Sequence, residues 1–370
     1  RRVPTSGQRH QRPQRAIHTN PDPDTVAHRL HVDIAGASPY GRGQDLVNRS
    51  DRTFIVARIY AALLLHRQLG DELVAIAVEL LGYEPQCVEV ARMPRGRGRV
   101  PIDRIPYAIE GALKSLAGHQ HVVLVGAKPP TAFFGYPGKP SLMSPPDAQM
   151  HVLARPDQDA VAALEWLADA LGAPAWAGAP DTGPRPTAQR GAFNPDAFAL
   201  TLAALLPDNA IVVEDAVTSG RSLFGHTFGA APNDWLQITG GAIGHGFPCA
   251  TGAAVACPER KVICLEGDGS AMYTIQSLWT MAREHLDVTV VIFNNTKYSV
   301  LEMEFARTGA RGGKPGPNAA SVLDIGGPDM DFVAIATGMG VQASRATTAE
   351  EFNQQFAAAI KAQYILIAER

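Results

Sequence analysis

The chain has 370 residues, 46% of them hydrophobic, and a formal net charge of -3. This length is enough for two or three domains with their own cores, and the near-neutral charge argues against a nucleic-acid partner. No apolar run approaches the roughly eighteen residues that a membrane span requires, and no signal-peptide pattern is present, so we expect no membrane partner.

The four cysteines, Cys87, Cys249, Cys257 and Cys264, form no Cys-x-x-Cys pair. Two of them lie in apolar segments that predict burial. This usage favours a reducing compartment, so we expect a cytoplasmic location.

The N-terminal region does not show the patterning of a packed domain. Residues 1–50 are rich in Arg, Pro and polar residues, which predicts little stable structure. Residues 53–81 are apolar and predict helix. We therefore expect residues 1–90 to be an irregular or truncated N-terminal region.

Residues 98–178 alternate between helical and strand patterns, which is typical of an α/β domain. The predicted elements in chain order are a helix over 105–116 that ends at Gly118, a strand over 121–125, a strand over 150–154 and a helix over 159–172. Residues 179–192 continue a stretch dense in Pro, Gly and Ala, and we interpret them as a linker.

The alternation resumes over residues 193–370. Near-continuous Val/Ile strands between helices predict a parallel sheet covered on both faces, so the fold class is α/β with doubly wound domains. Predicted helices cover 195–206, 247–256, 274–284, 331–340 and 347–360, and predicted strands cover 210–215, 261–268, 288–295 and 364–369. Thr348 and Glu351 form a capping-box pattern at the start of the last helix.

Asp268 and Asn295 stand at the carboxyl ends of two successive predicted strands, in GDG and NN. A right-handed crossover puts both strand ends on one rim of the sheet, where ligands bind in open α/β folds. If the strands are neighbours, a carboxylate and an amide oxygen converge, which suits Mg²⁺ and phosphate. Gly267 and Gly269 allow the backbone to approach phosphate closely. We also expect the apolar side chains of the 274–284 helix, among them Leu278 and Trp279, to face the sheet.

GDG followed within thirty residues by NN resembles the cofactor motif of thiamine diphosphate (ThDP) enzymes. Across residues 211–306 the chain resembles the acetolactate synthase and benzoylformate decarboxylase group, through IVVEDAVTSG, GGAIGHGFPCATGAA and NNTKYSVLE. Fainter resemblance extends through the linker into 98–178, which looks like the central domain of that group. Residues 193–370 would then be the C-terminal diphosphate-binding domain.

The resemblance implies a role for each matching position. Mg²⁺ would be held by the side chains of Asp268 and Asn295 and by the backbone carbonyl of Lys297. Ile243 would support the bent cofactor, and the carbonyl of Gly241 would meet its aminopyrimidine. Contacts near the diphosphate would come from Thr218, Ser219, Gly267, Gly269, Ser270, Ala271 and Tyr298.

The activity implied is ThDP- and Mg²⁺-dependent decarboxylation or carboligation of a 2-oxo acid, in the manner of acetolactate synthase large subunits. A benzoylformate-type decarboxylase is the first alternative. A nicotinamide-binding Rossmann dehydrogenase is less well supported, because GGAIGHG lacks the G-x-G-x-x-G order. FAD is not expected, since VVLVGAKPP in the central domain has no glycine-rich loop. The site of this family lies between subunits, so a homodimer or homotetramer is implied.

One catalytic group of the family is not found. Its pyrimidine-binding domain supplies a glutamate that activates the cofactor, and residues 1–90 do not resemble that domain. Glu79 and Glu84 lie in or beside the apolar part of this region, and we interpret them as a solvated helix face and a turn. Three explanations stay open: a truncated or altered reading of the gene upstream, a pyrimidine-binding domain on a separate chain, or a catalytically inactive ThDP-binding chain.

Three further residues allow two interpretations each, and a fourth, Arg307, marks a predicted loop. His226 and His245 could protonate substrate, but structural hydrogen bonding is the more common role of such residues. Glu214 could order the diphosphate loop or cap a helix. Arg307 and the Gly- and Pro-rich stretch after it suggest a mobile lid. The sequence does not select the 2-oxo acid or its acceptor.

Overall fold

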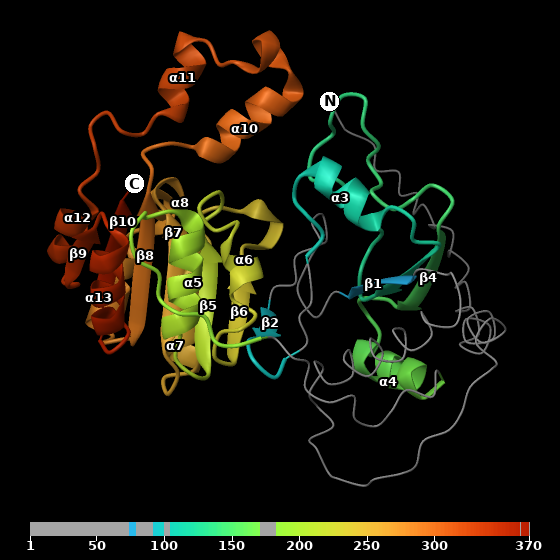
Figure 1. Cartoon of the computed structure of the whole chain (residues 1–370), viewed down its shortest axis with the longest axis horizontal. Helices are drawn as coiled ribbons and strands as arrows, with labels where there is room; N and C mark the ends of the chain where they lie inside the picture. Colours follow the sequence, from blue (N-terminus) through green and yellow to red (C-terminus); the bar gives the residue numbers. More distant parts are fainter. Residues whose placement is uncertain (1–73, 79–91, 100–103, 171–182, 363, 370) are drawn as a thin grey trace, which may run out of the picture.

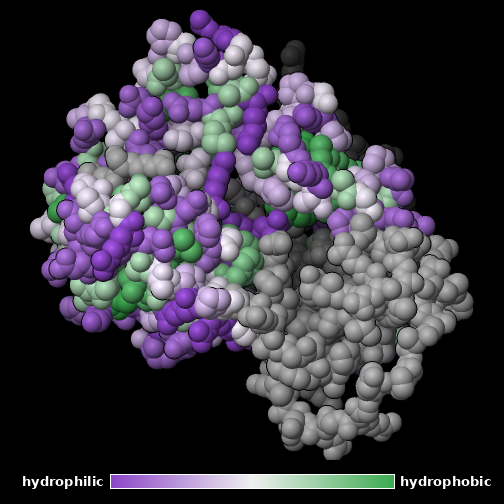
Figure 2. All heavy atoms as spheres, viewed as in Figure 1, coloured by the Kyte–Doolittle hydropathy of each residue, from purple (hydrophilic) through white to green (hydrophobic). Residues whose placement is uncertain are grey.

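The computed structural model describes residues 74–78, 92–99, 104–170, 183–362 and 364–369. These residues form two sheets with their helices, a large one built mainly from the C-terminal half and a small one (Figure 1). On the face shown in Figure 2 the surface mixes hydrophilic and apolar residues, and a hollow lies between the two units. Among the described residues no helix is both long and apolar enough to cross a bilayer.

The large sheet has seven strands in the order β2-β6-β5-β7-β8-β10-β9. Neighbouring strands are parallel, except that β2 runs antiparallel to β6 at one edge. The strands are β2 (Arg92–Arg95), β5 (Ala210–Asp215), β6 (Asn233–Gln237), β7 (Val262–Gly267), β8 (Val288–Asn294), β9 (Ala343–Ala346) and β10 (Tyr364–Glu369).

Helices cover both faces of this sheet, which confirms the predicted α/β fold class. On one face, Leu202 of α5 and Phe356 of α13 belong to one buried core. On the other face, Phe247 of α7, Met281 of α9 and Phe332 of α12 belong to a second core. The helices of this domain are α5 (Pro195–Leu205), α6 (Leu223–His226), α7 (Gly246–Ala256), α8 (Asp268–Thr274), α9 (Ser277–Arg283), α10 (Ser299–Thr308), α11 (Pro317–Leu323), α12 (Phe332–Gly338) and α13 (Ala349–Ala359).

The central strands are mainly apolar because they are buried on both sides, and their acidic residues stand at or near the carboxyl ends. In β7, Ile263 and Leu265 enter the core under α5 and α13, while Val262 and Cys264 enter the core under α7 and α9. Side chains of successive strand residues point to opposite faces, so apolar residues are needed on both faces. This is why the sequence reveals β5, β7 and β8 so clearly.

The small sheet holds β1 (Val74–Val78), β3 (His121–Val125) and β4 (Gln149–Ala154), all parallel and in the order β1-β3-β4. Its helices are α3 (Ile109–Leu116) and α4 (Ala160–Ala170). The helix predicted over 53–81 is wrong for Val74–Val78, which pairs with β3, and the rest of that range lies outside the described residues. A short apolar run does not distinguish strand from helix by periodicity, and here pairing with a neighbouring strand decides.

The helix predicted over 274–284 is also corrected. It is divided into α8, which begins at Asp268, and α9. Leu278 is buried as expected, but Trp279 is 53% exposed and does not face the sheet. The break between the two short helices changes which side chains point inward, so the single-helix periodicity does not apply.

Arg307 lies within α10 and not in a loop. The Gly- and Pro-rich stretch that follows forms a short 3₁₀ turn, Ala310–Gly313, and leads into α11. Figure 1 shows α10 and α11 projecting beyond the end of the large sheet. The predicted Thr348–Glu351 capping box is present at the start of α13.

Candidate functional site

The carboxyl ends of β7 and β8 lie side by side. The two strands are parallel, with Gly267 opposite Phe293. Asp268 follows β7 directly as the first residue of α8, and Asn295 follows β8 directly. The sequence prediction that these strands are neighbours is therefore confirmed.

The carboxylate of Asp268 joins the two strand ends. Its Oδ1 accepts a hydrogen bond from the N–H of Gly269 at 2.7 Å. Its Oδ2 accepts from the N–H of Asn295 at 2.9 Å and from the N–H of Thr296 at 2.6 Å. Thr296 has a φ of 57°, so the chain turns sharply around the carboxylate. The side chain of Asp268 is 3% exposed, and burial raises its pKa, against the lowering effect of the three N–H donors.

The loop after β8 is fixed by its own side chains and by the segment near α11. Asn295 Oδ1 accepts from the N–H of Lys297 at 3.0 Å. The N–H of Tyr298 donates to the carbonyl of Leu323 at 2.9 Å, and Lys297 forms an isolated antiparallel bridge with Asp324. Among the described residues no three His, Cys, Asp or Glu side chains gather as a metal site. Of the predicted metal ligands only Asp268 is of these residue types, so this result does not test the predicted magnesium site.

The glycine at position 269 makes room for Tyr298. A Cβ there would lie 2.4 Å from Cε1 of the tyrosine ring, a distance that no side chain tolerates. The ring therefore packs on the first turn of α8, beside Asp268, and burial raises its pKa. Ser270 is buried in the same turn. Ala271 is completely buried in the core under α7 and α9.

A second loop, from Gly241 to Gly246, is held from below by Asp215, the last residue of β5. Asp215 Oδ2 accepts from the N–H of Gly244 at 2.8 Å and from the N–H of Gly246 at 3.1 Å. Thr274 Oγ1, at the end of α8, donates to the carbonyl of Gly244 at 2.8 Å. The half-buried Ile243 directly precedes Gly244, whose N–H and carbonyl are both anchored. Sequence reasoning missed Asp215, although an acidic residue ending an apolar strand was a usable signal.

Asp215 has a second buried acid beside it. Glu266 lies opposite it in the β5–β7 register, and both side chains are completely buried. Burial raises the pKa of Asp215 to about 6. Burial, together with the charge of Asp215, raises the pKa of Glu266 well above its usual range. At Gly246 an added Cβ would lie 1.9 Å from Glu266 Oε2, so the loop rests directly on this acid pair.

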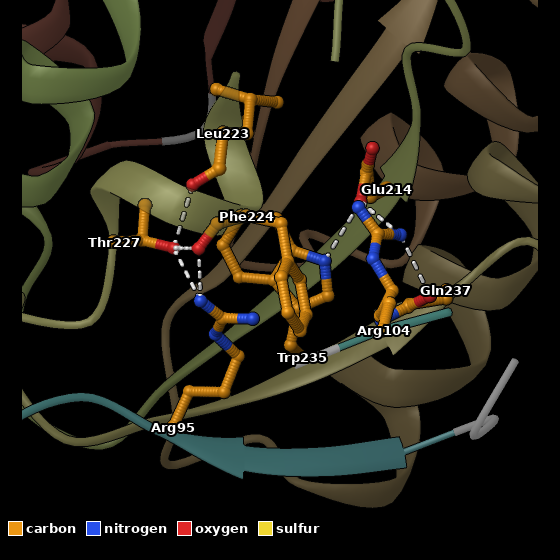
Figure 3. Close-up of polar contacts among 8 residues, drawn as sticks. All are labelled: Arg95, Arg104, Glu214, Leu223, Phe224, Thr227, Trp235 and Gln237. Carbon is orange, nitrogen blue, oxygen red and sulfur yellow. Dashed lines mark hydrogen bonds and ion pairs between the residues drawn. The ribbon is translucent and has the colours of Figure 1, made fainter. Parts of the chain in front are cut away.

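A third loop, residues 216–222, follows β5 and contains Thr218 and Ser219. Glu214 lies beneath it: a Cβ at Gly220 would be 2.5 Å from Glu214 Oε1. Glu214 Oε2 accepts a hydrogen bond from Trp235 Nε1 at 2.9 Å (Figure 3). Glu214 does not cap α6, because the N-cap position of that helix is Ser222. The geometry therefore favours a role for Glu214 in supporting the loop.

Side chains of the small unit reach two of these loops. A Cβ at Gly241 would be 2.6 Å from Cζ of Phe133, so that ring covers the second loop. Tyr136 donates its hydroxyl hydrogen to Glu304 Oε2 on α10 at 3.0 Å, and Glu304 forms an ion pair with Arg307. The structure thus brings the small unit against both the second loop and the helix that follows Asn295.

The two histidines have structural surroundings. His226 lies 3.4 Å from Asp196 as a surface ion pair. His245 precedes α7, and burial lowers its pKa. These contacts favour the structural interpretation for His226, and the half-buried position of His245 agrees with it.

Comparison with known proteins relates this chain to thiamine diphosphate enzymes. Residues 221–368 match the family described as "Thiamine pyrophosphate enzyme, C-terminal TPP binding domain". The chain is 50% identical over 275 residues to the Mycobacterium tuberculosis protein named for an acetolactate synthase large subunit, IlvX, covering 74% of this chain and 52% of that protein. It is 31% identical over 263 residues to benzoylformate decarboxylase of Pseudomonas aeruginosa, covering 67% of this chain and 47% of the relative.

The chain spans about half the length of these curated relatives. Among solved structures, the ThDP-dependent 4-hydroxybenzoylformate decarboxylase of Rhodococcus jostii RHA1 is similar, with a TM-score of 0.59 and 24% identity. That comparison covers 90% of this chain and 66% of the solved chain. At this identity it supports the fold alone.

Proposed function

Because this chain belongs to the thiamine diphosphate-dependent enzymes of the acetolactate synthase and benzoylformate decarboxylase group, we propose that it binds ThDP through Mg²⁺ and acts on a 2-oxo acid. The observation that carries the proposal is the joining of β7 and β8 by the Asp268 carboxylate. This contact draws the loop that begins at Asn295 toward the first turn of α8.

The donor set fits the metal. Asp268 and Asn295 offer a carboxylate and an amide oxygen on adjacent strand ends, and the backbone carbonyl of Lys297 is the third proposed ligand. Hard oxygen ligands of this kind suit Mg²⁺, which takes its remaining ligands from water and phosphate. Magnesium would relieve the cost of burying the Asp268 carboxylate, the same burial that raises its pKa in the free protein.

The surrounding backbone fits a diphosphate. Gly267 and Gly269 leave the start of α8 open to close approach, and Ser270 and Ala271 follow in the same turn. Thr218 and Ser219, on the loop after β5, are proposed as further contacts from the neighbouring strand end. Tyr298 is proposed to cover the diphosphate from the β8 side.

The Gly241–Gly246 loop is proposed to hold the rest of the cofactor. Ile243 would be the apolar support for the bend, and the Gly241 carbonyl would meet the aminopyrimidine. Asp215 fixes this loop through two hydrogen bonds, so Ile243 is oriented before any ligand arrives. Bound ThDP supplies the C2 carbanion and the electron sink that decarboxylation requires, while the protein binds and orients it.

The reaction we favour is acetolactate synthase-like carboligation, and its support is the 50% identity with IlvX. A benzoylformate-type decarboxylase is the alternative, supported by the 31% identity with the Pseudomonas enzyme. The activating glutamate is not identified among the described residues. We propose that a pyrimidine-binding domain supplies it, on a separate chain or in a homodimer or homotetramer, and a chain without it would bind ThDP and remain inactive.

Calorimetry of ThDP binding tests the site. We expect wild-type protein to bind ThDP with Mg²⁺ and to lose binding when the metal is chelated. Asp268→Asn keeps an oxygen acceptor for the backbone but loses the charge, and should weaken binding by about tenfold or more. The matched control is Asp331→Ala, which removes the carboxylate that accepts from the N–H groups of Val333 and Ala334 at the start of α12.

Wild-type affinity in Asp268→Asn would contradict the site assignment. An equal loss in Asp331→Ala would show that general destabilisation, and not the metal, lowers the affinity. For the reaction, products are analysed after incubation of a 2-oxo acid with the loaded protein. An acetohydroxy acid supports the carboligase, an aldehyde supports the decarboxylase, and no turnover of any 2-oxo acid supports the inactive chain.

A further inference from the structure

Arg104 links the ends of two strands of the large sheet. It lies in the segment between β2 and α3, and its side chain extends between Glu214 and Gln237 (Figure 3). Nη1 of Arg104 donates to Gln237 Oε1 at 2.9 Å and lies 3.8 Å from Glu214 Oε2. One guanidinium therefore bridges β5 and β6.

Both of its partners are buried and stand next to the loops of the candidate site. Glu214 and Gln237 are opposite each other in the β5–β6 register. Glu214 supports the loop that contains Thr218 and Ser219, since Gly220 packs on its Oε1. Gln237 is the last residue of β6, and the loop with Gly241 and Ile243 begins just after it. A displacement of the Arg104 side chain would therefore move the first residues of both loops.

The aromatic ring of Phe224 extends this linkage to α6. The guanidinium carbon of Arg104 lies 4.1 Å from the ring centroid, and that of the buried Arg95, from β2, lies 3.4 Å from it. Arg95 also donates to the Phe224 carbonyl and to Thr227 Oγ1. The segment from β2 to α3 thus contacts the carboxyl ends of β5 and β6 through Arg104, and α6 through both arginines.

We propose that Arg104 is a positioning residue that sets the Thr218–Ser219 loop and the Gly241–Ile243 loop at the spacing required for ThDP. The inference rests on the proposed function, because it assumes that both loops contact the cofactor. Since Arg104 is followed directly by Ile105 and the rest of the small unit, the same contact would transmit the placement of that unit to the cofactor site. A partly buried ion pair adds little net stability compared with well-packed apolar residues of similar volume. The Arg104–Glu214 pair is therefore better explained by its effect on the position of the two loops.

The test compares two arginines that contact opposite ends of β6, Arg104 through Gln237 and Arg92 through Asp234. Arg104→Met removes the contact at the carboxyl end of β6. Arg92→Met is the matched control, since Arg92 pairs with Asp234 at 3.1 Å near the amino end of β6, away from the loops. ThDP affinity with Mg²⁺ is measured by calorimetry, and the thermal midpoint by circular dichroism, on the full chain. We expect Arg104→Met to weaken ThDP binding about fivefold or more, and Arg92→Met to leave it unchanged.

Two further variants separate positioning from general destabilisation. Arg104→Lys should recover part of the affinity, because it keeps the charge near Glu214. Adding Glu214→Gln to Arg104→Met should cause a smaller further loss than Glu214→Gln causes alone, because both act through one contact. If Arg104→Met does not fold, Arg104→Lys is compared with Arg92→Lys in the same assay.

The outcomes are distinguishable. If wild-type protein binds ThDP and Arg104→Met binds it as tightly as Arg92→Met does, the positioning role is overturned while the proposed function stands. The role is also overturned if affinity falls only in proportion to the thermal midpoint across all variants. If wild-type protein binds no ThDP with Mg²⁺, the proposed function itself fails.

Discussion

Two glycines of one helix provide a sharp test of the packing under the candidate site. Gly246 and Gly252 both lie in α7. At Gly246 an alanine Cβ would lie 1.9 Å from Glu266 Oε2 and 2.9 Å from Asp215 Cβ, and both acids are completely buried. At Gly252 an added Cβ meets nothing within 4 Å. The same substitution therefore creates a clash at one end of the helix and none in its middle.

The magnitudes follow from these distances. Overpacking in a closed site costs about 1–3 kcal/mol, and weakening the 3.1 Å hydrogen bond from Gly246 to Asp215 costs about 1 kcal/mol more. Gly252→Ala should instead stabilise the helix by about 0.5–1 kcal/mol, because alanine is the better helix former. We therefore expect Gly246→Ala to be about 3 kcal/mol less stable than Gly252→Ala.

Urea unfolding followed by far-ultraviolet circular dichroism measures this difference on the full chain. The two variants should show equal slopes and different midpoints, with wild-type protein between them. Free energies of unfolding within about 1 kcal/mol of each other would refute the reasoning. Such a result would mean that Glu266 moves aside at little cost and that the acid pair does not support the loop.

Two other predictions concern buried polar contacts. Because the pKa of Asp215 is raised from 3.8 to about 6, the folded protein holds this proton more tightly than the unfolded chain; stability should therefore fall as pH rises from about 4 to 6, by at most about 3 kcal/mol. The free energy of unfolding should differ less between pH values of about 4 and 6 in Asp215→Asn than in wild-type protein. The same pH dependence in both proteins would contradict the raised pKa of Asp215. Tyr136→Phe should cost about 1–2 kcal/mol, because the buried hydroxyl donates to the Glu304 carboxylate. Tyr273→Phe, at a position 59% exposed, is the control, and equal losses in urea unfolding would argue against the contact between the two units.

The activating glutamate and the reaction remain separate questions from the cofactor site. The proposed site residues in the C-terminal domain follow four strand ends of one sheet, so they can be tested by binding alone. We propose that turnover additionally requires the activating glutamate of a pyrimidine-binding domain. Measuring ThDP affinity before activity therefore distinguishes a wrong site from an incomplete one.

Several features could be predicted from the sequence because they depend on local patterns. Strands β5, β7 and β8 carry consecutive apolar residues over most of their length, since both faces of a parallel sheet are covered. Asp268 and Asn295 could be placed at neighbouring strand ends, because a right-handed crossover fixes the side on which both strands end. The capping box of α13 is also local, as it needs only Thr348 and Glu351 at the right spacing.

The tertiary structure decided what depends on partners distant in the chain. Strand β6 contains Asn233, Asp234 and Gln237, and its polar residues hid it from any apolar pattern. Gln237 accepts from Arg104, and Asp234 pairs with Arg92 and Arg260; these contacts make a buried polar strand possible.

The same reason explains why Asp215 was overlooked while Glu214, one residue away, was considered. Both end β5, and nothing in the sequence says which carboxylate faces the loop of Gly244 and Gly246 and which faces Trp235. By itself the sequence determined the apolar strands of the sheet and the common rim at which Asp268 and Asn295 lie. Only the folded chain decided which buried charges hold the loops in place, because such pairings depend on side-chain direction and on neighbours 21 to 133 residues away.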